Sequence, residues 1–327
     1  MGVTYSGPTI GTPWHWAGFL GLVAVLLALD LGVFHRRDRV PSIGAALAWT
    51  SAWVGVAAAF GAWVYARLGA KVALQFSAAY LLEKALSVDN LFVFVFVFGA
   101  FGTPRELHHR VLFWGILGAL VTRGAFIGLG TQLVQRFDLV LYVFGAFLLL
   151  TGARAMLERG EKGPQLGPLA RLVERLVSAR RGYHEHHFVV REHGHRHATR
   201  LFAVLLSIEG ADVLFAVDSI PAALAISTNP FIVFSSNILA VLGLRSLYFA
   251  LAAGVDRFRH LRYGLAAVLV FVGGKMLLSD VVELPILLSL GIIGLLVGGS
   301  VVASLVTRGR CSRRGRGRRG RRGARLS

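Results

Sequence analysis

Apolar runs of about twenty residues recur along almost the whole chain, and short charged segments separate them. A helix of that length is long enough to cross the hydrocarbon core of a bilayer. Because backbone polar groups in lipid must be satisfied within the spanning structure, only helices and closed barrels span membranes. The runs lack the alternation that is typical of barrel strands. The sequence therefore predicts an all-α protein, a polytopic membrane helical bundle.

The limits of the apolar runs predict about nine spans, numbered here in chain order. They cover residues 15–34, 43–66, 73–100, 111–131, 139–157, 201–222, 231–253, 263–279 and 285–306. The predicted organisation is spans one to five in 1–157, a cytoplasmic basic His-rich loop in 158–200, spans six to nine in 201–306, and a disordered Arg/Gly-rich cytoplasmic tail in 307–327.

The basic residues predict the orientation of the chain in the membrane. The formal net charge is +18, and most Lys and Arg residues lie in the tail and in the connections on one side of the spans. Since positively charged connections stay in the cytoplasm, we expect a bacterial-type plasma membrane with the N-terminus outside and the C-terminus inside. We expect lipid headgroups as partners of the basic segments, and no nucleic acid. Cys311 is the only cysteine, so the chain has no internal disulfide.

Two spans carry carboxylates about midway along their apolar runs. A charge at the bilayer centre costs roughly 2.5–3.5 kcal/mol, so such residues normally face a bundle interior and mark functional sites. In each span the two acids lie six residues apart, and a polar residue follows the second acid. The candidate ligands of a metal or substrate are Glu83, Asp89 and Asn90 in span three, and Asp212, Asp218 and Ser219 in span six.

The spans that follow these two also correspond. Spans four and seven each place one arginine in an apolar run, Arg123 and Arg245, and spans five and eight end in similar Gly-basic-Met patterns. Spans 3–5 and 6–8 are therefore interpreted as two copies of one unit. Because each copy has three helices, the copies cross the membrane in opposite senses, as an inverted repeat. Transporters of this architecture hold their substrates at the midplane between the repeats.

Helical spacing predicts which of these side chains share a face. Glu83, Ser87 and Asn90 are related as i, i+4 and i+7, whereas acids six apart are about 120° apart around a straight helix. Pro221 removes a backbone donor, and we expect a helix break there that turns Asp218 inward. Glu209 is a second-sphere or proton-relay candidate.

The oxygen-rich ligand set suits hard divalent cations, Mn²⁺ or Ca²⁺, as transported ions, with no permanently bound cofactor. Because facing carboxylates repel one another, proton-for-cation exchange is a hypothesis for the mechanism. The alternative is structural: the acids pair with Lys84, Arg123 and Arg245 as counter-charges that hold the helices together.

At these residues the chain resembles the TerC family of integral membrane proteins. The resemblance rests on Glu83–Phe92, Phe215–Ala222, Pro230–Asn237 and Gly243–Phe249. It implies a membrane protein related to cation exporters, associated with manganese efflux and with tellurium resistance. Tellurite is an anion, so a carboxylate site has the wrong charge for it, and we expect any tellurium phenotype to be indirect.

These observations predict a membrane transporter, not an enzyme, that exports divalent metal cations, Mn²⁺ first, through a midplane carboxylate site. The outward direction is implied by the resemblance alone. The alternative is a non-transporting membrane scaffold or assembly factor in a stress-response complex, with membrane or stress-complex proteins as partners. The two hypotheses predict different results when the aspartates are replaced by asparagine. A transporter should lose transport, whereas a scaffold should keep its function.

Overall fold

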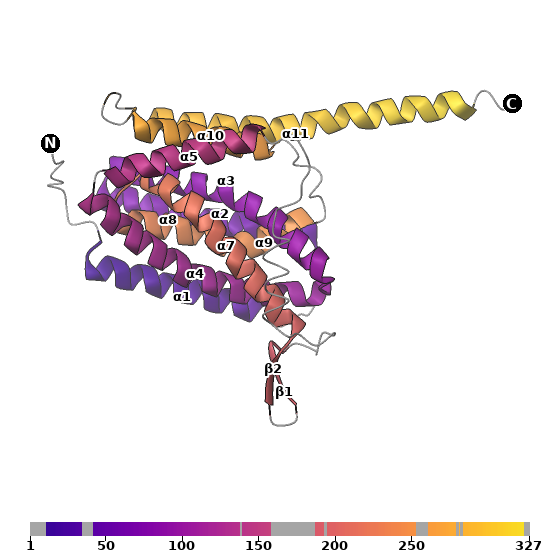
Figure 1. Cartoon of the computed structure of the whole chain (residues 1–327), viewed down its shortest axis with the longest axis horizontal. Coiled ribbons are helices and arrows are strands. Elements are labelled where there is room, and N and C mark those ends of the chain that lie inside the picture. Colours follow the sequence, from indigo (N-terminus) through magenta and orange to yellow (C-terminus); the bar gives the residue numbers. More distant parts are fainter. Residues whose placement is uncertain are drawn as a thin grey trace.

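The computed structural model describes residues 11–34, 42–137, 139–157, 187–192, 195–252, 261–278, 281 and 284–323. Helices joined by short connections make up nearly all of this part of the chain, with one β-hairpin (Figure 1). Seven helical stretches of the described residues are long and apolar enough to cross a membrane, and one of them, Pro230–Ala250, is interrupted by a turn at Gly243. The predicted all-α polytopic membrane bundle is therefore confirmed.

The elements follow the predicted spans in order. The helices are α1 (Pro13–Phe34), α2 (Ile43–Leu68), α3 (Ala70–Phe101), α4 (Arg105–Arg136), α5 (Leu139–Leu157), α7 (Arg200–Leu224), α8 (Pro230–Leu242), α9 (Leu244–Ala252), α10 (Leu261–Leu277) and α11 (Ile286–Gly323). The strands β1 (Val189–Glu192) and β2 (His195–Ala198) pair antiparallel. Most of the predicted His-rich loop, residues 158–186, lies outside the described residues, and the hairpin forms its last part.

Helix α7 is long enough to cross a membrane, but charged side chains interrupt its apolar sequence. Any stretch of 18 residues within it contains at least three charged side chains. Such a helix is stable in a membrane only when neighbours cover its charges. Helices α3, α4 and α5 contact it, and Asp212 and Ser219 are both buried.

The contacts between helices follow the predicted repeats. The first helix of each copy packs on the second helix of the other, α3 on α8 and α4 on α7, and the two third helices, α5 and α10, pack on each other. Figure 1 shows α5 and α10 side by side along one edge of the bundle. This reciprocal pairing is the pattern that two oppositely oriented copies produce around a two-fold axis.

Small residues bring α5 and α10 into backbone contact. A Cβ added to Gly273 would lie 2.7 Å from the carbonyl oxygen of Gly145, and one added to Gly152 would lie 2.9 Å from that of Ala266. The repeat matches Gly152 with Gly273, and the same offset matches Gly145 with Ala266. Gly145 of the first copy therefore contacts Gly273 of the second, and Gly152 of the first contacts Ala266 of the second. The two contacts are equivalent under the symmetry of the repeat.

The structure contradicts the predicted helix break at Pro221. Helix α7 continues through Pro221 to Leu224, because the proline removes only its own donor and its carbonyl still accepts from the amide of Ala225. The discontinuous span is instead the seventh, where Gly243 separates α8 from α9. At its other end α8 is capped by Asn229, whose side chain accepts hydrogen bonds from the amides of Phe231 and Ile232.

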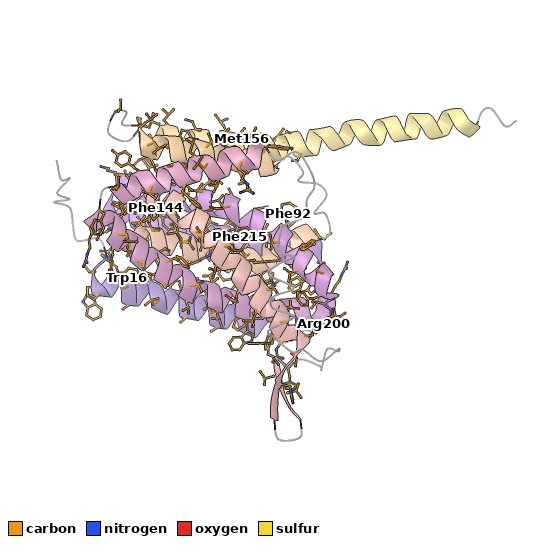
Figure 2. All side chains as sticks on the ribbon, viewed as in Figure 1. Trp16, Phe92, Phe144, Met156, Arg200 and Phe215 are labelled. Atoms are coloured by element: carbon orange, nitrogen blue, oxygen red, sulfur yellow. The ribbon has the colours of Figure 1, made fainter. Side chains whose placement is uncertain are left out.

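Helix α1 lies outside the repeats and is attached to α8 by aromatic contacts. The ring of Trp16 lies 5.4 Å from the rings of both Phe231 and Phe234, measured between centroids. Figure 2 shows Trp16 at the end of α1, with Phe144 and Phe215 among the side chains between the helices.

The last helix, α11, continues far beyond the bundle (Figure 1). It begins at Ile286 and ends at Gly323, so it includes most of the tail for which the sequence predicts disorder. No proline interrupts this stretch, and arginine is a good helix former, although each glycine costs about 1 kcal/mol relative to alanine.

Candidate functional site

A fully buried arginine connects the two predicted acidic stretches. Arg123, on α4, donates a hydrogen bond from Nη1 to Glu83 Oε1 on α3. Its Nη2 and Nε donate to the two carboxylate oxygens of Asp212 on α7, at 2.8 and 3.1 Å. Nη1 also donates to Asn237 Oδ1 on α8, at 3.1 Å. These four residues are called the Arg123 cluster.

The Arg123 cluster joins the two repeats. Glu83 and Arg123 belong to the first copy, and Asp212 and Asn237 to the second. The two-pronged contact between Arg123 and Asp212 is the strong geometry for a guanidinium and a carboxylate. With every group ionised, two carboxylates and one guanidinium leave a net charge of −1 inside the bundle.

The two predicted helix faces point inward. On α3, Glu83, Ser87 and Asn90 expose 2%, 0% and 2% of their surface, as their i, i+4, i+7 spacing predicts. The Ser87 hydroxyl lies 3.5 Å from Glu83 Oε1, to which it donates. On α7, Asp212 and Ser219 share the buried face and expose 3% each.

Several buried polar atoms near this level lack a partner among the described residues. They are Glu83 Oε2, Asn237 Nδ2, Ser219 Oγ and the Tyr80 hydroxyl. An unsatisfied buried polar atom costs about 1–3 kcal/mol, so such atoms usually contact water or a ligand. Two of the four belong to the Arg123 cluster, which therefore keeps unused binding capacity.

Glu209 lies one helical turn before Asp212 and packs against the backbone of α4. A Cβ added to Gly118 would lie 2.1 Å from Glu209 Oε1, so only glycine leaves room for the carboxylate in this position. A Cβ on Gly115 would lie 3.9 Å from the same oxygen. The glycines of α4 thus bring Glu209 close to the Arg123 cluster.

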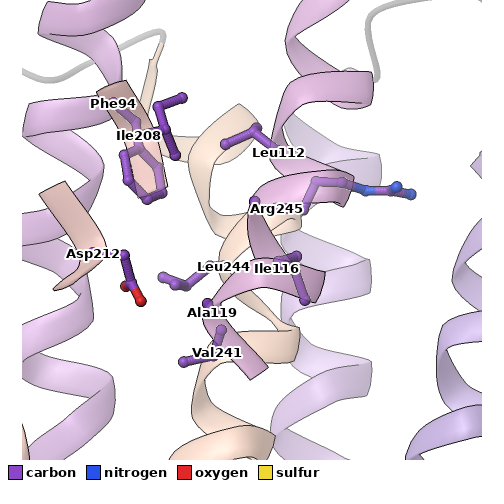
Figure 3. Close-up of a pocket in the computed structure, with 10 residues that line it drawn as sticks. Phe94, Leu112, Ile116, Ala119, Ile208, Asp212, Val241, Leu244 and Arg245 are labelled. Atoms are coloured by element: carbon purple, nitrogen blue, oxygen red, sulfur yellow. The ribbon is translucent and has the colours of Figure 1, made fainter. Parts of the chain in front are cut away.

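A small cavity with room for about one water molecule adjoins Asp212. The cavity is displaced from the Arg123 cluster along both helices. On α3 it lies beyond Glu83, toward the C-terminal end, and on α4 it lies before Arg123, toward the N-terminal end. Figure 3 shows the Asp212 carboxylate among apolar side chains, with the guanidinium of Arg245 directed away from them. The lining residues are Phe94, Leu112, Gly115, Ile116, Ala119, Ile208, Asp212, Val241, Leu244 and Arg245.

Among the described side chains, the contacts of Arg245 and Lys84 are with partners other than Glu83, Asp212 and Asp218. Arg245 Nη2 donates to the Asp30 carboxylate of α1 at 3.1 Å and to the Asp30 carbonyl at 3.3 Å. Lys84 Nζ donates to the carbonyl of Ala240, in the last turn of α8, at 3.1 Å. Of the three predicted counter-charges, Arg123 therefore joins the two acidic stretches. Arg245 binds α1, and Lys84 binds the end of α8.

Asp218 is not among the described partners of Arg123. Asp218 is partly buried and lies beside Leu214 and Val217, which are exposed on the outer surface of α7. The backbone of Asp89 is in α3, but its side chain lies outside the described part. Among the side chains that the structure describes, no three His, Cys, Asp or Glu residues gather closely enough to hold a metal ion.

The sequence reasoning missed Asn237 and Asp30 as partners of the two arginines. Asn237 is an amide within an apolar run and is completely buried, so its polarity was the available signal. Asp30 belongs to α1, outside the repeats, and repeat matching gives no signal for it.

Comparison with known proteins identifies the family. The family model described as the integral membrane protein TerC family matches residues 68–312. The uncharacterized membrane protein STKORF319 of Myxococcus xanthus is 49% identical over 300 residues, covering 91% of this chain and 94% of that protein. The putative membrane-bound redox modulator Alx of Escherichia coli (strain K12) is 44% identical over 300 residues, covering 88% and 94%. No solved structure matches the chain. The chain belongs to the TerC family of integral membrane proteins.

Proposed function

We propose that this protein is a membrane transporter that exports divalent metal cations, Mn²⁺ first, through a site between its two repeats. The observation that carries the proposal is the meeting of Glu83 and Asp212, acids from different repeats, at one buried guanidinium. A carboxylate pair shared between inverted repeats is the arrangement in which relative motion of the repeats opens a midplane site to either side.

In the described conformation Arg123 takes the place of the ion. Its guanidinium uses three of the four carboxylate oxygens of Glu83 and Asp212, and Glu83 Oε2 has no partner among the described residues. A divalent cation binds when Arg123 swings away, and the guanidinium returns when the ion leaves. This exchange keeps the carboxylates compensated in a medium where an unpaired charge is costly.

The ligands that remain are oxygen donors. Carboxylates from Glu83 and Asp212, and those of Asp89 and Asp218 after rearrangement, fit Mn²⁺ or Ca²⁺, with Asn90 and Ser219 as neutral helpers. Glu209 is the adjoining carboxylate for proton exchange. No permanently bound cofactor and no enzymatic reaction form part of this proposal.

The orientation is part of the same proposal. The cavity beside Asp212 lies toward the start of α4, the side that the basic connections place in the cytoplasm. With the N-terminus outside and the C-terminus in the cytoplasm, this cavity lies on the cytoplasmic side of Asp212. A tellurium-resistance phenotype then follows indirectly, from altered metal homeostasis.

Transport is tested by measuring Mn²⁺ uptake into everted membrane vesicles. We expect wild type to accumulate Mn²⁺, and Asp89→Asn, Asp212→Asn and Asp218→Asn to lose uptake at equal protein amounts. Asp30→Asn is the matched control, because Asp30 is also a buried aspartate paired with an arginine but lies outside the Arg123 cluster. Equal uptake by wild type and the three site variants would rule the proposal out.

The second candidate is a non-transporting scaffold or assembly factor, with membrane or stress-complex proteins as partners. It is favoured by the direct pairing of Arg123 with both acids, which by itself holds α3, α4 and α7 together. On that reading the aspartate-to-asparagine variants keep cellular function if they fold. The word redox in the name of the Escherichia coli relative fits an indirect effect here, since a single cysteine cannot form a dithiol pair within the chain.

A further inference from the structure

At the break between α8 and α9 a lysine ammonium contacts the carbonyl end of α8. Lys84 Nζ donates to the carbonyl of Ala240 at 3.1 Å. The Gly243 carbonyl accepts from the Ser246 hydroxyl at 3.0 Å, and the Ser246 hydroxyl in turn accepts from Thr50 of α2 at 3.2 Å. The break is therefore lined by carbonyl and hydroxyl oxygens, from α8, α9 and α2.

This end of α8 attracts positive charge. The last carbonyls of a helix have no intrahelical donor, and the aligned peptide dipoles place about half a negative charge there. Carbonyl ends of interrupted membrane helices bind coupling cations in other transporter folds. Neutral oxygens suit a monovalent cation, whereas the carboxylates of the Arg123 cluster suit a divalent one.

Gly243 leaves room for the lysine at this position. A Cβ added to Gly243 would lie 2.8 Å from Lys84 Nζ and 3.1 Å from Trp53 Cβ. The backbone does not demand glycine, since the φ of Gly243 is −82°. The missing side chain therefore serves packing: it lets the ammonium approach the end of α8.

We propose that the carbonyl end of α8 is a monovalent-cation site and that the chain fills it with its own Lys84 ammonium. The Lys84 ammonium takes the role of a bound coupling cation, because it compensates the partial negative charge at the carbonyl end of α8. Wild-type protein accordingly needs neither Na⁺ nor K⁺ for its folded structure. This inference concerns a different site from the Arg123 cluster and does not depend on Mn²⁺ transport.

The test is chemical rescue of Lys84→Ala, read as the unfolding temperature of purified full-length protein in detergent. We expect Lys84→Ala to unfold at a lower temperature than wild type, and methylammonium, Na⁺ or K⁺ to restore most of the loss in a saturable manner. N-methylglucamine, which is too large for the space, keeps the ionic strength constant and should not rescue. Wild type should respond to none of these cations.

Lys84→Met is the matched control. Methionine keeps much of the side-chain volume without the charge, so it should lose stability and leave no space for a cation to restore it. Recovery of Lys84→Met to the same extent as Lys84→Ala would overturn the site, because the salt effect would then be general. Wild-type stability in Lys84→Ala, or a loss that no cation restores, would overturn it as well.

Gly243→Ala provides a second test if Lys84→Ala does not fold. The added methyl group should push the ammonium off the end of α8 and lower the unfolding temperature, whereas Gly55→Ala on α2, which has open space, should not. Gly243→Ala should cost less in a Lys84→Met background, because the displaced group is then absent. Equal costs in both backgrounds would assign the loss to Trp53 and refute the proposal.

Discussion

Arg123 and Asp212 face each other across α4 and α7 with two parallel hydrogen bonds, Nη2 to Oδ1 at 2.8 Å and Nε to Oδ2 at 3.1 Å. Arg123 is fully buried and Asp212 is 3% exposed, so neither charge is solvated by bulk water. The pair is thus a joint between the two repeats as well as the centre of the candidate site.

Removing the guanidinium should destabilise the protein strongly. Arg123→Gln leaves the Glu83 and Asp212 carboxylates without their charged partner, and breaking a buried ion pair typically costs about 3–5 kcal/mol. Denaturant unfolding in detergent micelles measures the loss. The double variant Arg123→Gln/Asp212→Asn should lose less than the sum of the single losses, since one stranded charge is gone. Strict additivity would mean that the two residues do not interact.

Filling the space at Gly118 should move Glu209 without unfolding the protein. The clashing atoms belong to the flexible end of the Glu209 side chain, and alanine favours the helix by about 1 kcal/mol. If the protein transports Mn²⁺, Gly118→Ala should therefore impair uptake as Glu209→Gln does. Gly128→Ala on the same helix has open space and serves as the control. Equal uptake by Gly118→Ala and Gly128→Ala would show that the place of the carboxylate does not matter.

The α5–α10 contact should tolerate no side chain at Gly273. A Cβ there would lie 2.6 Å from the backbone nitrogen of Leu149, which cannot move aside as a side chain can. Gly273→Ala should cost about 1–3 kcal/mol through overpacking. The neighbouring Gly274 has nothing within 4 Å, so Gly274→Ala should be neutral or mildly stabilising. The test is to compare the thermal unfolding temperatures of Gly273→Ala and Gly274→Ala. Equal losses of stability in the two variants would contradict the close packing at Gly273.

Asp30 and Arg245 should be energetically coupled to each other and not to the Arg123 cluster. Their side chains are both buried and lie 3.1 Å apart. A double-mutant cycle with Asp30→Asn and Arg245→Gln should give a coupling of about 0.5–3 kcal/mol. The same cycle with Asp212→Asn in place of Asp30→Asn should give a value near zero. A large coupling to Asp212 would instead support the prediction that Arg245 is a counter-charge of the midplane acids.

Periodicity and charge were sufficient to predict the bundle and the centre of the site. The spans follow from apolar runs of membrane-crossing length, and the inward faces of Glu83, Ser87 and Asn90 follow from helical spacing alone. Arg123 was predictable as a counter-charge because a buried arginine in a membrane must pair, and the acids are the strongest partners in the chain.

The predictions that failed depended on tertiary contacts. Pro221 was expected to break α7, but the break lies at Gly243, where Lys84 from another helix stabilises the freed carbonyl end. Arg245 was expected to pair with the midplane acids, and among the described side chains it pairs with Asp30 of α1, a helix outside the repeats. The sequence around a polar group does not determine which neighbouring helix will supply its hydrogen-bond partner.

The division of the Arg123 cluster between the two halves of the chain has a consequence for membrane insertion during synthesis. Helices α3 and α4 leave the ribosome before α7 and α8, so Glu83 and Arg123 must enter lipid while Asp212 and Asn237 do not yet exist. Their mutual contact neutralises both charges at that stage. Helices α3 and α4 can therefore wait in the bilayer with Glu83 and Arg123 already paired, and the arrival of α7 and α8 completes the Arg123 cluster.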